Sequence, residues 1–156
     1  MGLFLSTFVN KIDKKGGVSV PASFRAALSA ESFQGFIAFR SYRDAAVECC
    51  GYARMQRLSE SVDALDAFSP EQDHLASTIF ADAQMLVFDV DGRVVLPALL
   101  VEHASLTDQV AFVGRGGTFQ LWHPQAFEDA QRQARKNVQE GRGVLKLVPS
   151  KPGDAS

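Results

Sequence analysis

Asp89 and Arg93 stand four positions apart in this 156-residue chain, with Val-Asp-Gly between them. Asp-Gly between two apolar runs is a signal for a tight β-hairpin turn. Such a turn would project the guanidinium group outward, where it can form two parallel hydrogen bonds with a phosphate or a guanine edge. The Asp89 carboxylate could hold the arginine, or it could accept the N–H groups of the turn. The same residues are common in ordinary solvated turns, so the motif alone does not decide the function.

The segment around this motif repeats an earlier one. Residues 12–22 read Ile-Asp-Lys-Lys-Gly-Gly-Val-Ser-Val-Pro-Ala, and residues 88–98 read Phe-Asp-Val-Asp-Gly-Arg-Val-Val-Leu-Pro-Ala. Five positions are identical at a constant offset of 76 residues. Gly17 is the first-copy counterpart of Arg93, and Lys14 and Lys15 precede it in the same turn. The duplication predicts two similar units related by a pseudo-twofold axis, an arrangement suited to a repeated or symmetric target.

The other residues with chemical potential do not converge on a catalytic or metal site. The three histidines are far apart and lack the spacing of metal ligands, and no phosphate-binding motif follows the Arg-Gly-Gly turn at 115–117. Cys49 and Cys50 are adjacent and have no activating base beside them. In a strand they would point to opposite faces, one buried and one exposed. We therefore expect a protein that is not an enzyme and that needs no cofactor or metal.

Charge is distributed unevenly along the chain, although the formal net charge is only −2. Residues 58–92 contain eight acidic residues and no lysine or arginine. In residues 1–25 and 131–156, by contrast, most of the charged residues are basic. Folding can gather these charges into an acidic and a basic face, although two solvated surfaces explain the same pattern. No apolar run is long enough to span a membrane, and the N-terminus lacks the features of a signal peptide. We expect a cytoplasmic protein with reduced cysteines.

Hydrophobic periodicity predicts the elements that must carry the two turns. Strands are expected over residues 4–11, 18–20, 36–39, 45–50, 85–88, 94–96, 109–113 and 118–122. Short helices are expected after each repeated proline, over 22–28 and 97–104. A further helix places Leu58, Val62 and Leu65 on one face, another begins with a capping box at Ser69, and a last one runs over 124–139. The order strand-turn-strand-helix-strand-strand-helix therefore occurs twice, in units too small to bury a core alone.

At these residues the chain resembles the MraZ family, which belongs to the AbrB-like swapped-hairpin group of DNA-binding folds. The family pattern Asp-x-Lys-Gly-Arg-x-x-x-Pro-x-x-Phe-Arg matches residues 13–25, except that Gly17 replaces the arginine. The second copy keeps Asp89, Gly92, Arg93 and Pro97. Residues 119–122, Phe-Gln-Leu-Trp, followed by Phe127, resemble the closing segment of the family. The resemblance covers nearly the whole chain.

The resemblance implies a fold and its boundaries. We expect an α+β protein of two tandem AbrB-like swapped-hairpin β units related by a pseudo-twofold, with a helical insert and a C-terminal helix. The expected divisions are a first unit over 7–54, the insert over 55–82, a second unit over 83–126, the C-terminal helix and extension over 127–148, and a disordered tail over 149–156.

The resemblance also implies a function. It predicts a cytoplasmic, nucleoid-associated regulator, expected to be a repressor, of the cell-division and cell-wall gene cluster. Such a protein would bind tandem promoter repeats in double-stranded DNA through its hairpin turns, as a ring-like homo-oligomer. The residues expected to bind DNA are Asp13, Lys14, Lys15, Arg25, Asp89 and Arg93. Because Gly17 replaces an arginine, we expect weaker or less specific binding per protomer. The alternative is an oligomeric scaffold that binds a protein partner and has weakened DNA binding.

Overall fold

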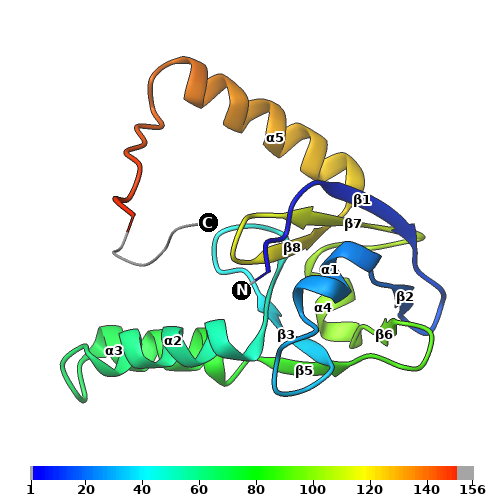
Figure 1. Cartoon of the computed structure of the whole chain (residues 1–156), viewed down its shortest axis with the longest axis horizontal. Coiled ribbons are helices and arrows are strands. Elements are labelled where there is room, and N and C mark those ends of the chain that lie inside the picture. Colours follow the sequence, from blue (N-terminus) through cyan, green and yellow to red (C-terminus); the bar gives the residue numbers. More distant parts are fainter. Residues whose placement is uncertain (1, 151–156) are drawn as a thin grey trace. The chain divides into compact units, whose positions relative to one another are not determined.

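The computed structural model describes residues 2–150. The chain divides into two compact units, Met1–Pro124 and Gln125–Ser156. The described strands all lie in the first unit, and the described part of the second comprises helix α5 (Pro124–Gln139), apart from its first residue, and residues 140–150 (Figure 1). The mixed α+β class predicted from the sequence is confirmed. Most of the tail predicted over 149–156 lies outside the described residues.

A six-stranded antiparallel sheet is the centre of the first unit, with the strand order β1-β7-β8-β4-β3-β5. Strands from the two sequence copies are interleaved in it, because β1 pairs with β7, β4 pairs with β8 and β3 pairs with β5. Neither copy therefore forms a separate sheet. The strands are β1 (Thr7–Lys11), β3 (Gly35–Arg40), β4 (Val47–Cys50), β5 (Gln84–Val87), β7 (Gln109–Gly114) and β8 (Phe119–Trp122).

A two-stranded antiparallel ribbon joins the repeated segments directly. It pairs β2 (Gly17–Ser19) with β6 (Arg93–Val95), and Val18 lies opposite Val94. Each ribbon strand leads through its proline into a short helix, α1 (Ala22–Ala27) or α4 (Ala98–His103). The prolines suit these positions because the first turn of a helix needs no N–H donor from them.

The main core lies between the large sheet and the ribbon with its two helices. Phe24 of α1 is completely buried at its centre. Its ring centroid lies 5.3 Å from that of Phe4, 5.6 Å from Phe8, 6.3 Å from Phe112 and 5.0 Å from Phe119. Because these rings come from both sequence copies, the core fixes the two copies to each other.

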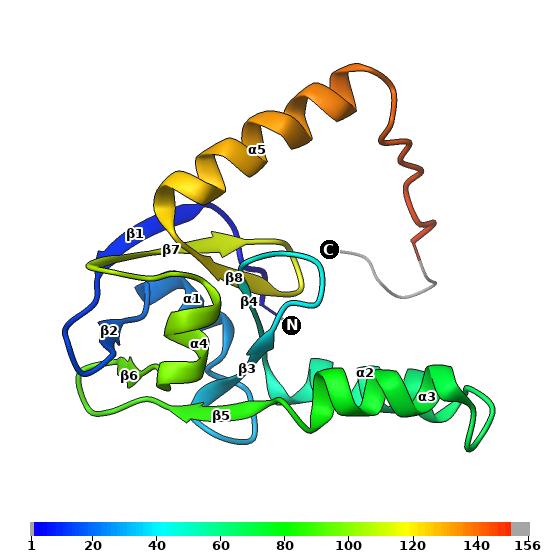
Figure 2. The ribbon, with the colours of Figure 1, turned by 180° about the vertical axis from the view of Figure 1, so that it is seen from behind.

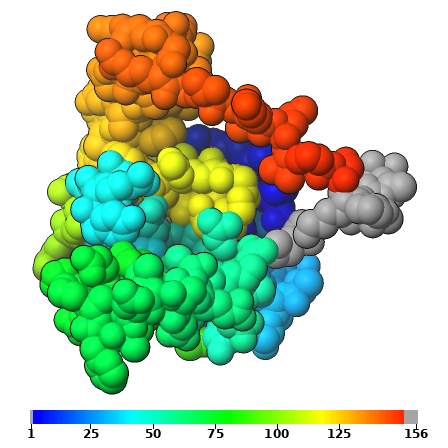
Figure 3. Space-filling view, turned by 90° about the vertical axis from the view of Figure 1, so that its left-hand side faces the viewer, coloured from blue at the N-terminus to red at the C-terminus, as the bar shows by residue number. Residues whose placement is uncertain are grey.

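A helical arm leaves the sheet between β4 and β5 and extends away from the ribbon (Figures 1 and 2). It comprises α2 (Tyr52–Asp63), α3 (Pro70–Leu75) and a π-helical turn, η1 (Ala76–Phe80). Ser69 caps α3 as predicted, because its hydroxyl accepts the N–H of Gln72. In the space-filling view of Figure 3 the arm, coloured green, presents a continuous surface.

The arm explains why one prediction about the cysteines is wrong. Cys49 and Cys50 were expected to differ in exposure, but both are buried. Cys49 faces the main core, whereas Cys50 lies in a second apolar cluster with Ile37, Met55 and Ile79. The arm covers the outer face of this part of the sheet, so both faces of β4 are shielded from water.

Three local departures from the predicted elements have backbone causes. The first strand begins at Thr7 and not at Phe4, because Ser6 has a positive φ of 72° and interrupts it. The helix after Ser69 widens into the π-helical turn at Ala76. Leu65, expected on the buried face of α2, lies beyond the end of that helix and is 39% exposed.

Candidate nucleic-acid interface

The two repeated turns have the same internal hydrogen bonds. In the first turn, Asp13 Oδ1 accepts the N–H groups of Lys15 at 2.9 Å and Gly17 at 2.8 Å. In the second turn, Asp89 Oδ1 accepts the N–H groups of Asp91 at 2.8 Å and Arg93 at 3.0 Å. Each aspartate thus shapes its own turn, which was one of the two roles considered for Asp89.

Glycine is required at one position of each turn. Gly16 and Gly92 have φ values of 89° and 75°, a conformation that other residues rarely adopt. Each glycine also takes part in the ribbon, because Gly16 O accepts the N–H of Leu96 at 2.8 Å and Gly92 O accepts that of Val20 at 3.1 Å. The backbone of each turn is therefore fixed by a strand of the other copy.

The Arg93 guanidinium contacts the aspartate of the opposite copy. Its Nη2 atom lies 3.3 Å from Asp13 Oδ2, and both side chains are substantially exposed, at 39% and 54%. The pKa of Asp13 is lowered by the N–H groups of Gly17 and Lys15 and, to a smaller extent, by the positive charges of Arg93 and Lys15. Asp13 therefore carries its negative charge at neutral pH and holds Arg93 loosely at the protein surface.

Arg25 lies against the second turn, although it belongs to the first copy. Its Nε atom donates to Val20 O at 3.1 Å, and its guanidinium group covers Gly92. A Cβ atom at Gly92 would lie 2.7 Å from Arg25 Cζ, so a side chain here would displace the Arg25 guanidinium group. The structure thus brings Arg25, Arg93 and Asp13 into one surface region.

The two lysines of the first turn are exposed beside that region. Lys14 and Lys15 form no ion pair within residues 2–150. The Asp89 carboxylate lies in the second turn and accepts hydrogen bonds from the backbone N–H groups there. We call the surface formed by the six predicted residues the turn surface. Its members are Asp13, Lys14, Lys15, Arg25, Asp89 and Arg93.

Sequence reasoning missed the contacts that connect the copies. Asp13 and Arg93 are 80 positions apart, and Arg25 has no arginine at its second-copy counterpart, Val101. Asn10, which was not predicted to matter, donates from Nδ2 to Ser19 O at 2.7 Å and ties β1 to the ribbon. The constant offset of 76 residues between the two copies was the one sequence signal that related the two turns, because it placed them in equivalent positions.

Within the described residues, the histidines and cysteines form neither a metal site nor an activated nucleophile. No group of three potential metal ligands occurs among the described residues. Burial raises the pKa of the Cys50 thiol to about 11 and also raises that of Cys49, so neither thiol is activated as a nucleophile. Within residues 2–150, no helix combines the length and the apolar character that crossing a membrane requires.

Comparison with known proteins places this architecture in a family. The "Transcriptional regulator MraZ" of Rickettsia bellii (strain OSU 85-389) is 46% identical over 147 residues, which cover 94% of this chain and 98% of the relative. The chain belongs to the MraZ family. The relative of the same name from Rickettsia akari is 44% identical over 94% of this chain and 98% of its own length. The one from Pelagibacter ubique is also 44% identical, over 92% of this chain and 93% of its own length.

The family model described as "MraZ protein, putative antitoxin-like" matches residues 79–144. This match contains the whole second copy of the repeated segment, including Asp89 and Arg93, and all of α5. The MraZ resemblance seen in the sequence motifs is therefore confirmed by relatives that align over nearly the full chain.

Proposed function

We propose that this MraZ-family protein is a transcriptional regulator that binds double-stranded DNA through the turn surface. One observation carries the proposal: a shared ribbon holds two equivalent turns with rigid backbones and exposed cationic side chains. The relatives at 44–46% identity are named transcriptional regulators. A rigid turn that presents an arginine costs little conformational entropy when it binds, which favours recognition.

Arg93 is the group best suited to read DNA. Its guanidinium group can bind a guanine edge or a phosphate with two hydrogen bonds. The exposed contact with Asp13 keeps the side chain near the turn but leaves it accessible, so DNA can replace the carboxylate as its partner. Lys14 and Lys15 offer point charges, which suit phosphates better than bases.

The finer parts of the proposal come from the family resemblance. We propose cytoplasmic, nucleoid-associated action, as a repressor, on tandem repeats in the promoter of the cell-division and cell-wall gene cluster. A ring-like homo-oligomer would present several turn surfaces to successive repeats. Contacts that are weak in one protomer then add up, because each later contact forms at a high effective concentration.

Substitution of Arg93 by alanine tests the proposal. The DNA would be the region upstream of the chain's own gene, with a scrambled duplex of equal composition for comparison. Loss of a two-bond base contact costs about 1–3 kcal/mol, so we expect affinity for the specific duplex to fall roughly 5- to 150-fold. Arg57→Ala is the matched control, because Arg57 is an exposed arginine on the arm, away from the turns.

Two results would contradict the proposal. One is the absence of salt-sensitive binding to either duplex by the unaltered protein. The other is equal binding by the Arg93→Ala variant and the Arg57→Ala control, because the turn surface would then contribute nothing beyond its charge.

A second function is favoured by the arm. Phe68 lies in the loop between α2 and α3, is 99% exposed, and has a positive φ of 65°. It is surrounded in sequence by the acidic stretch 58–92. The oligomeric scaffold that binds a protein partner could use this arm, because aromatic residues are enriched at protein–protein interfaces. Such an interface need not have the steep salt dependence of DNA binding, so the salt series separates the two functions.

A further inference from the structure

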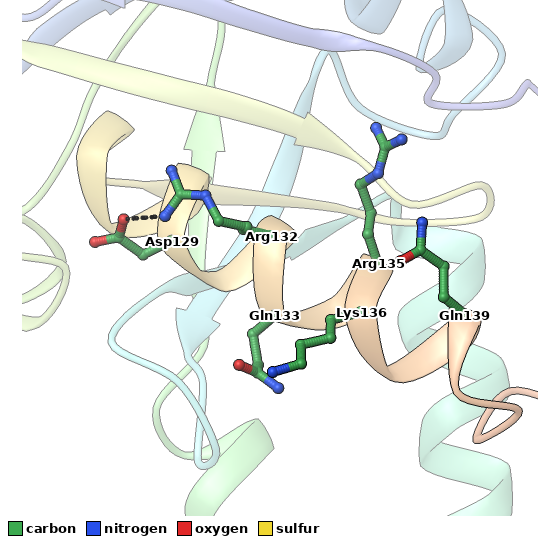
Figure 4. Close-up of a pocket in the computed structure, with 6 residues that line it drawn as sticks. All are labelled: Asp129, Arg132, Gln133, Arg135, Lys136 and Gln139. Carbon is green, nitrogen blue, oxygen red and sulfur yellow. Dashed lines mark hydrogen bonds and ion pairs between the residues drawn. The ribbon is translucent and has the colours of Figure 1, made fainter.

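Helix α5 has a strongly basic face that the turn surface does not include. Figure 4 shows Asp129, Arg132, Gln133, Arg135, Lys136 and Gln139 along this helix. These residues line a shallow hollow of about 460 Å³. The helical period of 3.6 residues places all of them on one side of α5. The apolar residues Phe127, Ala130, Ala134 and Val138 lie on the other side.

The charges of this basic face are only partly neutralised. Arg132 forms an exposed ion pair with Asp129, with Nη1 3.2 Å from Oδ1. Arg135 and Lys136, by contrast, are exposed and form no ion pair within residues 2–150. Residues 125–150 contain five lysines and arginines against three acidic residues. The second unit is thus positive although the whole chain is negative.

We propose that the basic face of α5 binds the sugar-phosphate backbone of DNA, independently of base sequence. This inference rests on the proposed function and assigns a second contact to the same complex. Arg132 to Gln139 spans about 10 Å of helix axis, whereas each DNA strand carries one phosphate per about 3.4 Å of its axis. The face therefore has the length to engage two or three phosphates.

The chemistry of the face suits phosphate and not base readout. Arg135 and Lys136 supply cationic donors, and the amides of Gln133 and Gln139 supply neutral donors that also bind phosphate oxygens. Gln133 Nε2 already donates one N–H to Asn137 Oδ1 at 3.0 Å, and its amide carries a second N–H that can bind a phosphate. In this division of roles the turn surface selects the sequence and α5 adds affinity for any duplex.

Removal of two charges from α5 tests the inference. The variant Arg135→Ala/Lys136→Ala would be compared with Arg54→Ala/Arg57→Ala, which removes the same net charge from an exposed face of α2. Affinities for the promoter duplex and the scrambled duplex would be measured from about 50 to about 200 mM salt. The affinity falls as salt rises, and each lost phosphate contact makes the slope of log affinity against log salt less steep by about 0.9.

The expected result is a slope reduced by about 2 for the α5 variant on both duplexes. This corresponds to a roughly 12-fold smaller change in affinity over that salt range. The ratio of the affinities for the two duplexes should stay unchanged, because α5 does not read bases. The α2 control should keep the slope of the unaltered protein. Far-ultraviolet circular dichroism would check that α5 remains helical.

The inference is overturned if the α5 variant keeps the slope of the α2 control. If light scattering then also shows a changed oligomeric mass, α5 binds another copy of the chain and not DNA. Failure of the proposed function is distinguishable. If Arg93→Ala retains sequence preference while the α5 variant loses slope, the turn surface is not the reader but α5 still contacts DNA.

Discussion

The glycine at position 17 offers the sharpest test of how the two turns work. Gly17 stands where the second copy has Arg93, and its φ is not positive, so its backbone does not itself require glycine. A Cβ atom added there would lie 2.6 Å from Asp13 Oδ2 and 3.1 Å from Arg93 Nη2. Any side chain at this position must therefore move the Asp13 carboxylate, and Arg93 loses its partner.

The second turn indicates that such a change is tolerated. There Arg93 carries a side chain, while Asp89 still accepts the same two N–H groups at 2.8 and 3.0 Å. Gly17→Arg should consequently fold and give both turns an arginine. If the new guanidinium makes a two-bond base contact, affinity per protomer should rise by about 1–3 kcal/mol, roughly 5- to 150-fold. If it binds a phosphate instead, the salt slope should steepen by about 0.9.

The assay is binding to the promoter duplex across a salt series, with Gly17→Ala as the control. The alanine variant displaces the Asp13 carboxylate and releases Arg93 but adds no charge. Its affinity therefore measures the effect of freeing Arg93, and the difference between the two variants measures the new arginine. Equal affinities for Gly17→Arg and Gly17→Ala would refute the idea that the first turn reaches DNA.

Two further predictions concern the fold. Phe24→Ala should lower the free energy of unfolding by about 3–5 kcal/mol in urea titrations, because it leaves a cavity where rings of both copies meet, whereas Phe24→Leu should cost much less. The hydrogen bond from Arg40 lowers the pKa of Asp82 in the folded protein. The pair therefore stabilises the protein fully at pH values above the unfolded pKa of aspartate, about 3.9. This contribution is lost as the pH falls through the lower pKa of the folded state. Asp82→Asn should therefore flatten the acid limb of stability below about pH 5, and an unchanged limb would contradict this assignment.

Much of the fold could be predicted because local patterns determine local structure. Proline at position 21 or 97, followed by helix formers, predicted α1 and α4, and the Ser69 cap predicted the start of α3. The Asp and Gly positions of each copy predicted the two turns, since those residues satisfy turn N–H groups and adopt positive φ. These signals lie within a few residues of the structure they specify.

The contacts that the sequence did not reveal are those between distant segments. The arm buries Cys50 by covering the outer face of β4, which the alternation within the strand could not indicate. The partners of Arg93 and Arg25 likewise depend on how the ribbon pairs the two copies. The repeat offset implies that the turns are equivalent, but it does not specify which side chain crosses from one turn to the other.

The contact between Arg93 of the second copy and Asp13 of the first makes the two turns differ in how they would bind DNA. Each turn aspartate uses Oδ1 for its own backbone, which leaves the second oxygen available to an arginine of the other copy. Asp13 receives Arg93, but within residues 2–150 no first-copy side chain forms an ion pair with Asp89, because position 17 is glycine. A protomer of the proposed regulator therefore has one arginine turn and one lysine turn. Since arginine reads base edges and lysine binds mainly phosphate charge, the two turns are unequal, and the protein should bind each DNA repeat in a single orientation.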